Sequence, residues 1–582
     1  MSLRWVYATP ENEEAVPALQ EQLGIPKNST PAYTAWNRHL MTRLEAFFRP
    51  DISDIHDPFL MKDMDKATDR LAKAIREGER ILVYGDYDVD GTTSTSILYI
   101  FLQEFGVDVD FYIPHRFKEG YGINQDGIQH AIDTEVDLIV SVDCGITAVE
   151  EVEQAKGHGI DMIICDHHNV ANQIPDAVAV LDPKRNDCEY PFKGLSGAGV
   201  AFKLLQGTIK KLGLSEQLAF KLLDLVAISI ASDIVPIEDE NRILMREGLK
   251  QINTSPRTGI KALLDLINLD IGNITTSNIV FSIGPRINAA GRMGDASKAV
   301  QLLISDTPAE AKSRAHELES INVARRDKDS ETMEEAKAMV DEEYNLDEIS
   351  SMVLHHPEWH LGVIGIVASR LVDTYGRPAV MLSTVNGKIK GSARSIDGFN
   401  IYEAFKQCED LLEQYGGHEY AAGLTIAKEN LDEFRRRMNE IAENNLSPED
   451  FTRELKIACE LDLSEVDMRF WKLLSQFEPF GPANLRPVFV SRDVRVVGVP
   501  TIVGKGHLKM KVAQNGSGNF DVIGFNMHEY LPVIRNSEDQ KLDIAYSLEE
   551  NEWNGRRTLQ VRLRDVQIRE ENRNKIGELL FV

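Results

Sequence analysis

Gly85-Asp86-Tyr87-Asp88-Val89-Asp90-Gly91 directly follows the apolar run from Ile81 to Tyr84, and this junction decides the fold. Similar β-branched and apolar runs recur further along the chain, with helix-like stretches between them: 109–113, 138–142 and 162–165. Short apolar runs that alternate with helices predict a parallel sheet covered by helices on both faces. The sequence therefore predicts an α/β fold from about residue 65 to residue 235.

Polar side chains follow two more of these runs, as Asp143-Cys144-Gly145 and as Asp166-His167-His168. The carboxyl ends of parallel strands meet at one edge of a sheet, which is where such folds place ligands. Carboxylates gathered there repel one another, and divalent cations neutralise them. Oxygen ligands mixed with imidazole favour Mn²⁺ or Mg²⁺ over zinc. Asp90 alone is typical of a helix cap and Asp143 of a turn, but the three strand ends together predict a metal centre.

Composition limits where the protein works and what it binds. The chain has 582 residues, enough for several domains, and no apolar stretch reaches the roughly 18 residues that a membrane span needs. Its start lacks the features of a secretion signal, so we expect a cytoplasmic protein with no membrane partner. The net charge of −28 disfavours nonspecific binding to nucleic acid, so any such site must be a local basic channel. The five cysteines are scattered and predict no disulfide framework.

The rest of the chain divides by pattern. Residues 1–50 are predicted to form a helical lead-in, 51–305 the first α/β domain and 306–345 a long, solvated connecting helix. A second α/β domain is predicted for 346–448. Short alternating runs in 449–582 predict a small β-barrel or sandwich.

The polar residues after the strands resemble the motifs of the DHH phosphoesterase superfamily, in the same order along the chain: Asp88-x-Asp90, Asp143 and Asp166-His167-His168. Ser232-Asp233 resembles the fourth acidic ligand of that superfamily. The resemblance implies that five side chains hold two divalent metals, Mn²⁺ or Mg²⁺: Asp88, Asp90, Asp143, His167 and Asp233. Asp143 would bridge the two metals.

The same resemblance implies roles for two further residues and points to one position at which this chain differs from some relatives. His168 would face the scissile phosphate, and Asp166 would brace the two histidines from behind. Some relatives carry a histidine where this chain has Tyr84. One metal is therefore predicted to lack a protein ligand there.

Three longer stretches resemble the RecJ branch, a family of exonucleases specific for single-stranded DNA: Tyr112 to Arg116, Leu195 to Ala201 and Gly284 to Met293. The resemblance covers about residues 55 to 500. It implies that Arg286 stabilises developing charge in catalysis, with Asn288 orienting the nucleotide. Arg116 and Arg292 would bind substrate.

The second α/β domain has motifs that resemble the DHHA1 domain: Trp359 to Gly365, Gly391 to Ser395 and Gly416 to His418. Their glycines let the backbone approach a phosphate closely. Side chains in or beside them are predicted to bind substrate, namely His360, Arg394, Ser395 and His418. Gly-Gly-His by itself is more typical of a turn.

Residues 477–484 resemble the entry into an OB-fold of the RecJ branch. Such barrels bind single strands through basic residues that track phosphates and aromatic residues that stack on bases. Candidates for tracking are Lys505, Lys509, Lys511, Arg556 and Arg557. A charged strand face is more often simply solvated.

The resemblance implies 5′-to-3′ hydrolysis of single-stranded DNA to 5′-mononucleotides in repair and recombination, by water held between metals roughly 3.5 to 4 Å apart. A helicase and a single-strand-binding protein are expected partners. Two other hypotheses stay open: a phosphodiesterase of short oligonucleotides or cyclic dinucleotides, and a non-catalytic, DNA-binding replication scaffold. The stretch from Gly284 to Met293 and the C-terminal β-domain disfavour the first. The complete set of acidic ligands disfavours the second.

Overall fold

The computed structural model describes residues 3–7, 47–171, 173–346, 348–514, 516–535, 541–553 and 556–568. The chain forms two compact units. One unit comprises Asp51–Phe451 with Gly481–Ala483, and the other comprises Met1–Pro50, Thr452–Phe480 and Asn484–Val582.

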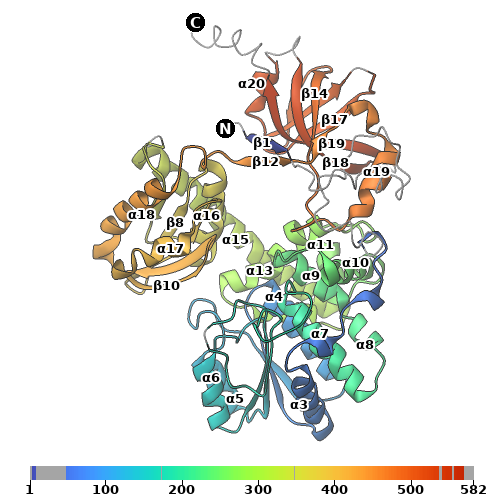
Figure 1. The fold of residues 1–582 in the computed structure, drawn as a ribbon, viewed down its shortest axis with the longest axis vertical. Coiled ribbons are helices and arrows are strands. Elements are labelled where there is room, and N and C mark those ends of the chain that lie inside the picture. Colours follow the sequence, from blue (N-terminus) through green and yellow to red (C-terminus); the bar gives the residue numbers. More distant parts are fainter. Residues whose placement is uncertain are drawn as a thin grey trace. The chain divides into compact units, whose positions relative to one another are not determined.

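A five-stranded parallel sheet in the order β3-β2-β4-β5-β6 forms the first α/β domain, as predicted. Its strands are β2 (Ile81–Tyr84), β3 (Val109–Tyr112), β4 (Leu138–Val142), β5 (Asp161–Cys165) and β6 (Ala179–Leu181). Because strand residues alternate between faces, Ile81 and Val83 pack on one side and Leu82 and Tyr84 on the other. The first side is covered by α3 (Met64–Glu77), α4 (Val89–Gln103) and α7 (Gly197–Leu212); the second is covered by α5 (Gln125–Asp133) and α6 (Val149–Gly157) (Figure 1).

A helical layer extends the core of this domain. It contains α8 (Gln217–Phe220), α9 (Leu223–Ser232), α10 (Asp239–Thr254), α11 (Thr258–Leu266), α12 (Thr276–Asn278), α13 (Gly284–Met293) and α14 (Ser297–Leu303). A π-helical turn, Ile279–Ile283, leads into α13. Such turns occur frequently at functional sites.

Helix α15 (Pro308–Glu343) is the predicted connecting helix, and Thr307 caps its start. It is solvated over most of its surface, as predicted, but one stripe that was not predicted is buried. Residues at intervals of three and four are buried along its whole length: Ala311, Ala315, Leu318, Asn322, Arg325, Asp329, Thr332, Ala336 and Val340. The middle of this buried stripe is polar, which is why the sequence shows no apolar face.

The second α/β domain has a mixed sheet in the order β10-β11-β9-β8-β7, in which β7 and β8 pair in parallel. Its elements are β7 (Met352–His355), α16 (Leu361–Tyr375), β8 (Ala379–Val385), β9 (Lys388–Arg394), α17 (Ile401–Lys406), β10 (Leu412–His418), β11 (Ala421–Ile426) and α18 (Leu431–Asn445). Helix α16 packs on one face of this sheet, and α17 and α18 pack on the other. Gly416 to His418 belong to strand β10 and are not a free turn.

The C-terminal unit is a closed β-barrel. Five strands form the ring: β14 (Phe489–Val496), β18 (Leu542–Trp553), β19 (Arg556–Ile568), β17 (Phe520–Gly524) and β16 (His507–Ala513), which pairs back to β14. The unit also contains β13 (Cys459–Glu460), β15 (Thr501–Val503), α19 (Met468–Leu474) and α20 (Tyr530–Arg535). The predicted barrel is confirmed.

The helical lead-in prediction for residues 1–50 is wrong for Arg4–Tyr7, which form strand β1 and pair with β12 (Glu454–Ile457). Residues 8–46 lie outside the described residues. Among the described helices, none is both long and apolar enough to cross a membrane.

Candidate metal centre and substrate pocket

The predicted metal ligands meet at the carboxyl edge of the first sheet. Asp88 follows β2 and caps α4 by accepting a hydrogen bond from the backbone N–H of Gly91 at 3.0 Å. Asp143 follows β4 in a left-handed conformation, with φ of 60°. Asp233 lies at the end of α9. Strand pairing aligns Asp88 and Asp143 with the histidines that follow β5, because β2, β4 and β5 run side by side, whereas Asp233 reaches the cluster from a helix.

The start of α7 anchors Asp90 in the centre. The carboxylate of Asp90 accepts hydrogen bonds from the backbone N–H groups of Gly197 at 2.6 Å and Ala198 at 2.8 Å, and from the Ser229 hydroxyl at 2.7 Å. A Cβ atom at Gly197 would lie 2.7 Å from the Cβ of Asp143. The glycine in this stretch is thus needed for α7 to approach the carboxylates.

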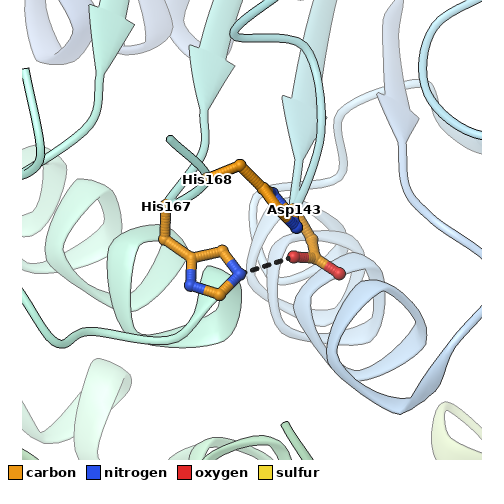
Figure 2. Close-up of side chains that lie close together, drawn as sticks. All are labelled: Asp143, His167 and His168. Atoms are coloured by element: carbon orange, nitrogen blue, oxygen red, sulfur yellow. Dashed lines mark ion pairs between the residues drawn. The ribbon is translucent and has the colours of Figure 1, made fainter. Parts of the chain in front are cut away.

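His167 lies among three carboxylates. Its Nε2 atom is 3.1 Å from Asp143 Oδ1, 3.7 Å from Asp90 Oδ2 and 3.6 Å from Asp233 Oδ2. Figure 2 shows the ring of His167 directed at the Asp143 carboxylate, with His168 beside them. The Nδ1 atom of His167 lies 3.0 Å from the Leu195 carbonyl oxygen, which fixes the ring so that Nε2 points into the cluster.

Asp166 lies behind the histidines, and its oxygens are occupied by protein groups. They accept hydrogen bonds from the backbone N–H of Ile146 at 2.8 Å, from those of His167 and His168, and from the His168 ring at 2.7 Å. Burial opposes ionisation, but the contact with His168 lowers the pKa of Asp166 to about 2. Against the effect of burial, the same contact raises the pKa of His168 to about 9. The Tyr121 hydroxyl lies 3.2 Å from the His168 ring.

The electrostatics of the cluster suit a divalent cation. Burial, together with repulsion from Asp90 and Asp88, raises the pKa of Asp143 well above its ordinary value and that of Asp233 to about 9. Burial lowers the pKa of His167, which keeps the ring neutral and able to bind a metal. A divalent cation would restore the charged carboxylates, because it stabilises their ionised form.

Asp86 is a candidate ligand that the predicted set of metal ligands omits. Its carboxylate lies with those of Asp88 and Asp143 in one group whose ligand atoms are all within 4.8 Å of one another. Tyr84, at the position that is histidine in some relatives, instead donates a hydrogen bond to the Gly122 carbonyl at 3.2 Å and is fully buried. The spacing of Asp86 two residues before Asp88, just after the strand, was the available signal.

A positively charged pocket of 640 Å³ lies beside the centre and is shared by the two α/β domains. Four of the predicted substrate residues line it: Arg116, Arg292, Arg394 and His418. Burial, with repulsion from Arg116 and Arg394, lowers the pKa of Arg292 to about 9. None of the three arginines forms an ion pair with a carboxylate of the described residues. Unpaired arginines suit a bound anion such as phosphate.

Two predicted substrate residues do not line this pocket. The Ser395 hydroxyl donates to the Phe399 carbonyl at 2.5 Å. His360 caps α16 by accepting from the Gly362 N–H at 3.0 Å. Ser392 lines the pocket instead, and its hydroxyl lies 2.9 Å from a guanidinium nitrogen of Arg394.

Family models match three parts of the chain: the DHH family N-terminal domain at residues 80–230, the DHHA1 domain at 348–444 and the RecJ OB domain at 457–565. The single-stranded-DNA-specific exonuclease RecJ of Bacillus subtilis (strain 168) is 38% identical over 577 residues, which covers 98% of this chain and 71% of that protein. The chain belongs to the RecJ family. The RecJ of Escherichia coli (strain K12) is 35% identical, over 86% of this chain and 89% of that protein.

Solved RecJ structures share the fold. RecJ from Thermus thermophilus in complex with Mn²⁺ has a TM-score of 0.81 at 29% identity, over 97% of this chain and 80% of that one. The same protein in complex with Mg²⁺ has a TM-score of 0.75 at 28% identity, over 97% of this chain and 79% of that one.

The residues of this RecJ family member fit divalent cations. Asp86 Oδ1 and His167 Nε2 are buried atoms with no hydrogen-bond partner among the described residues, although His167 Nε2 lies near Asp143. Carboxylate oxygens with one imidazole suit Mn²⁺ or Mg²⁺.

Helix α13, which carries a RecJ motif, presents two faces. Gly284, Asn288 and Gly291 share one face, and the glycines approach Ser232 and Tyr87 closely. Asn288 Oδ1 is buried there without a hydrogen-bond partner among the described residues. Arg286 lies on the opposite face.

Arg286 pairs with Glu319 of α15 at 2.6 Å. The predicted catalytic role of Arg286 stays a prediction, and its contacts with Glu319 do not support it.

In the barrel of the RecJ OB domain, Lys505, Lys509 and Lys511 are exposed. Lys509 and Lys511 share the outward face of β16, since their neighbours Leu508 and Met510 are buried. The side chains of Arg556 and Arg557 lie outside the described residues. The role of all five in tracking DNA stays a prediction.

Proposed function

We propose that this protein is a metal-dependent exonuclease that degrades single-stranded DNA from the 5′ end and releases 5′-mononucleotides. The observation that supports it most is the carboxylate and histidine cluster beside an unpaired arginine pocket, in a chain of the RecJ family. We further propose a cytoplasmic role in DNA repair and recombination, with a helicase and a single-strand-binding protein as partners.

Six residues of the cluster would hold two Mn²⁺ or Mg²⁺ ions: Asp86, Asp88, Asp90, Asp143, His167 and Asp233. When bound, such ions supply an activated water and offset charge on the phosphoryl oxygens. The buried carboxylates keep bulk water away from most of the cluster.

His168 is proposed to stabilise the negative charge that develops on the phosphate. The Asp166 carboxylate keeps the ring protonated near neutral pH, because it raises the pKa of His168 to about 9 against the effect of burial. The hydrogen bond between them, at 2.7 Å, also sets the direction of the ring. A positioned cation of this kind acts most strongly where water is excluded.

The arginine pocket is proposed to hold the 5′ end of the strand. Arg292 and Arg394 are partly buried cations without carboxylate partners among the described residues, and Ser392 adds a hydroxyl. Anchoring the 5′ end there would place the first internucleotide bond at the metals. It would also limit each cleavage to one nucleotide.

The test is a gel assay on 5′- and 3′-labelled single-stranded and duplex DNA, with Mn²⁺, Mg²⁺ or EDTA. We expect mononucleotide release from the 5′ end of the single strand only, and none with EDTA. Asp143→Ala should abolish it, since this carboxylate borders both halves of the cluster. A strong preference for a dinucleotide would favour the small-substrate enzyme, and unchanged activity of Asp143→Ala would refute the catalytic assignment.

Arg394→Ala tests the pocket separately. We expect KM to rise about tenfold on 5′-phosphorylated DNA, as for loss of one charge-assisted hydrogen bond, with less effect on DNA that has a 5′-hydroxyl. Equal effects on both substrates would place the 5′ end elsewhere.

A further inference from the structure

Lys184 lies on the loop that leaves the carboxyl end of β6, with an exposed side chain between two anchored neighbours. On one side, the buried Asp182 accepts a hydrogen bond from the Lys184 backbone N–H at 2.7 Å. On the other side, the buried Arg185 donates to the Val180 carbonyl at 2.6 Å and to the Asp63 carboxylate at 2.8 Å. The loop is therefore held rigidly while the lysine itself is presented to solvent.

This loop lies next to the metal centre. Cys165 of β5 pairs with Leu181 of β6, and the backbone N–H of Asp166 donates to the Leu181 carbonyl at 2.9 Å. The histidine pair follows β5, and β5 lies between β4 and β6 in the sheet. Lys184 therefore follows the strand next to the one that ends in the histidines.

Lys184 is a free cation on the flank that the arginine pocket does not occupy. No carboxylate of the described residues forms an ion pair with it. Arg116, which lines the pocket, follows β3 at one edge of the sheet, whereas Lys184 follows β6 at the other edge. The carboxylates lie after β2 and β4, between these two cations.

We propose that Lys184 binds the phosphate one nucleotide beyond the scissile bond of the single-stranded substrate. The inference rests on the proposed exonuclease activity and adds a contact to the same site. A strand with its 5′ end in the arginine pocket crosses the metal centre and continues toward β6, where its next phosphate meets Lys184. A lysine suits this position because it neutralises a phosphate without reading the base.

The test combines Lys184→Met with DNA that carries one uncharged methylphosphonate. We expect Lys184→Met to raise KM roughly fivefold, as for one partly exposed ionic contact, and to leave kcat within about twofold. A methylphosphonate at the second linkage from the 5′ end should raise the wild-type KM by a similar factor and have no further effect in the variant. A methylphosphonate at the fourth linkage should act equally on both proteins.

Two controls make the result specific. Lys261→Met removes another exposed lysine, on α11, and should leave KM and its salt dependence unchanged. In Lys184→Met the slope of log KM against log salt should fall by about 0.7, the value for one phosphate contact with a single strand. Lys184→Arg should restore most of the wild-type KM.

Additive effects of Lys184→Met and the second-linkage methylphosphonate would overturn the inference, as would an equal loss in Lys261→Met. If the wild-type protein does not degrade single-stranded DNA, the proposed function fails. If it does and the coupling is absent, only the role of Lys184 fails.

Discussion

Asp166→Asn tests whether a buried carboxylate organises the histidine pair from behind the metal centre. The shift of the Asp166 pKa from 3.8 to about 2, which contacts with His168 produce against the effect of burial, corresponds to about 2 kcal/mol of stability at pH 7. Because the pKa is depressed in the folded state, this contribution is fully present above pH 3.8. It is lost as the pH falls through about 2.

Asn keeps the shape but loses the charge, and its amide NH₂ faces groups that donate hydrogen bonds to Asp166. We expect a loss of about 2 kcal/mol in the free energy of unfolding and a roughly 10- to 100-fold weaker affinity for Mn²⁺, as for other residues that orient metal ligands. Urea unfolding measures the first. Titration of Mn²⁺ against the turnover of labelled single-stranded DNA measures the second.

Asp224→Asn is the matched control. Asp224 is also fully buried, and it accepts hydrogen bonds from the Arg257 guanidinium at 2.7 and 2.5 Å. It lies at the opposite end of α9 from Asp233, about 14 Å along the helix. We expect this control to lose stability while keeping its Mn²⁺ affinity. An Mn²⁺ affinity of Asp166→Asn within twofold of the control would refute the reasoning.

Three further predictions address other parts of the centre. His167 binds metal only as the neutral ring, and burial lowers its pKa, so turnover and apparent Mn²⁺ affinity should fall together only at a pH below the ordinary histidine pKa of about 6.5. A pH–rate profile that already declines above about pH 6.5 would contradict this. Gly197→Ala should lower kcat by about 100-fold, because the added Cβ would displace Asp143. Gly199→Ala on the same helix should keep near-normal turnover, because its Cβ would lie 3.1 Å from Cδ2 of Leu195, a side chain that can shift. Tyr84→Phe should lower the free energy of unfolding, measured in urea, by about 1 kcal/mol and leave the Mn²⁺ requirement unchanged, because the Tyr84 hydroxyl donates to a backbone carbonyl. An altered Mn²⁺ requirement would show that this hydroxyl reaches the metals.

The order of elements and the location of the metal centre were predictable from local pattern. Alternating apolar runs and helices predict parallel pairing, and parallel pairing brings strand ends to one edge. Asp88, Asp143 and His167 therefore meet as predicted. The long helix was also predicted, but its burial was not, because the Asn322 to Asp329 part of its buried stripe is polar.

Only the tertiary structure decided which polar side chains face the site. Asp86 reaches the cluster, while Arg286 pairs with Glu319 on the far face of α13. Ser392 lines the arginine pocket, while Ser395, three residues further along the chain, donates its hydroxyl to a backbone carbonyl. Local sequence determines the period of an element and hence its strand ends and helix faces. Which face meets which neighbour depends on packing between segments far apart in the chain, and no local pattern records it.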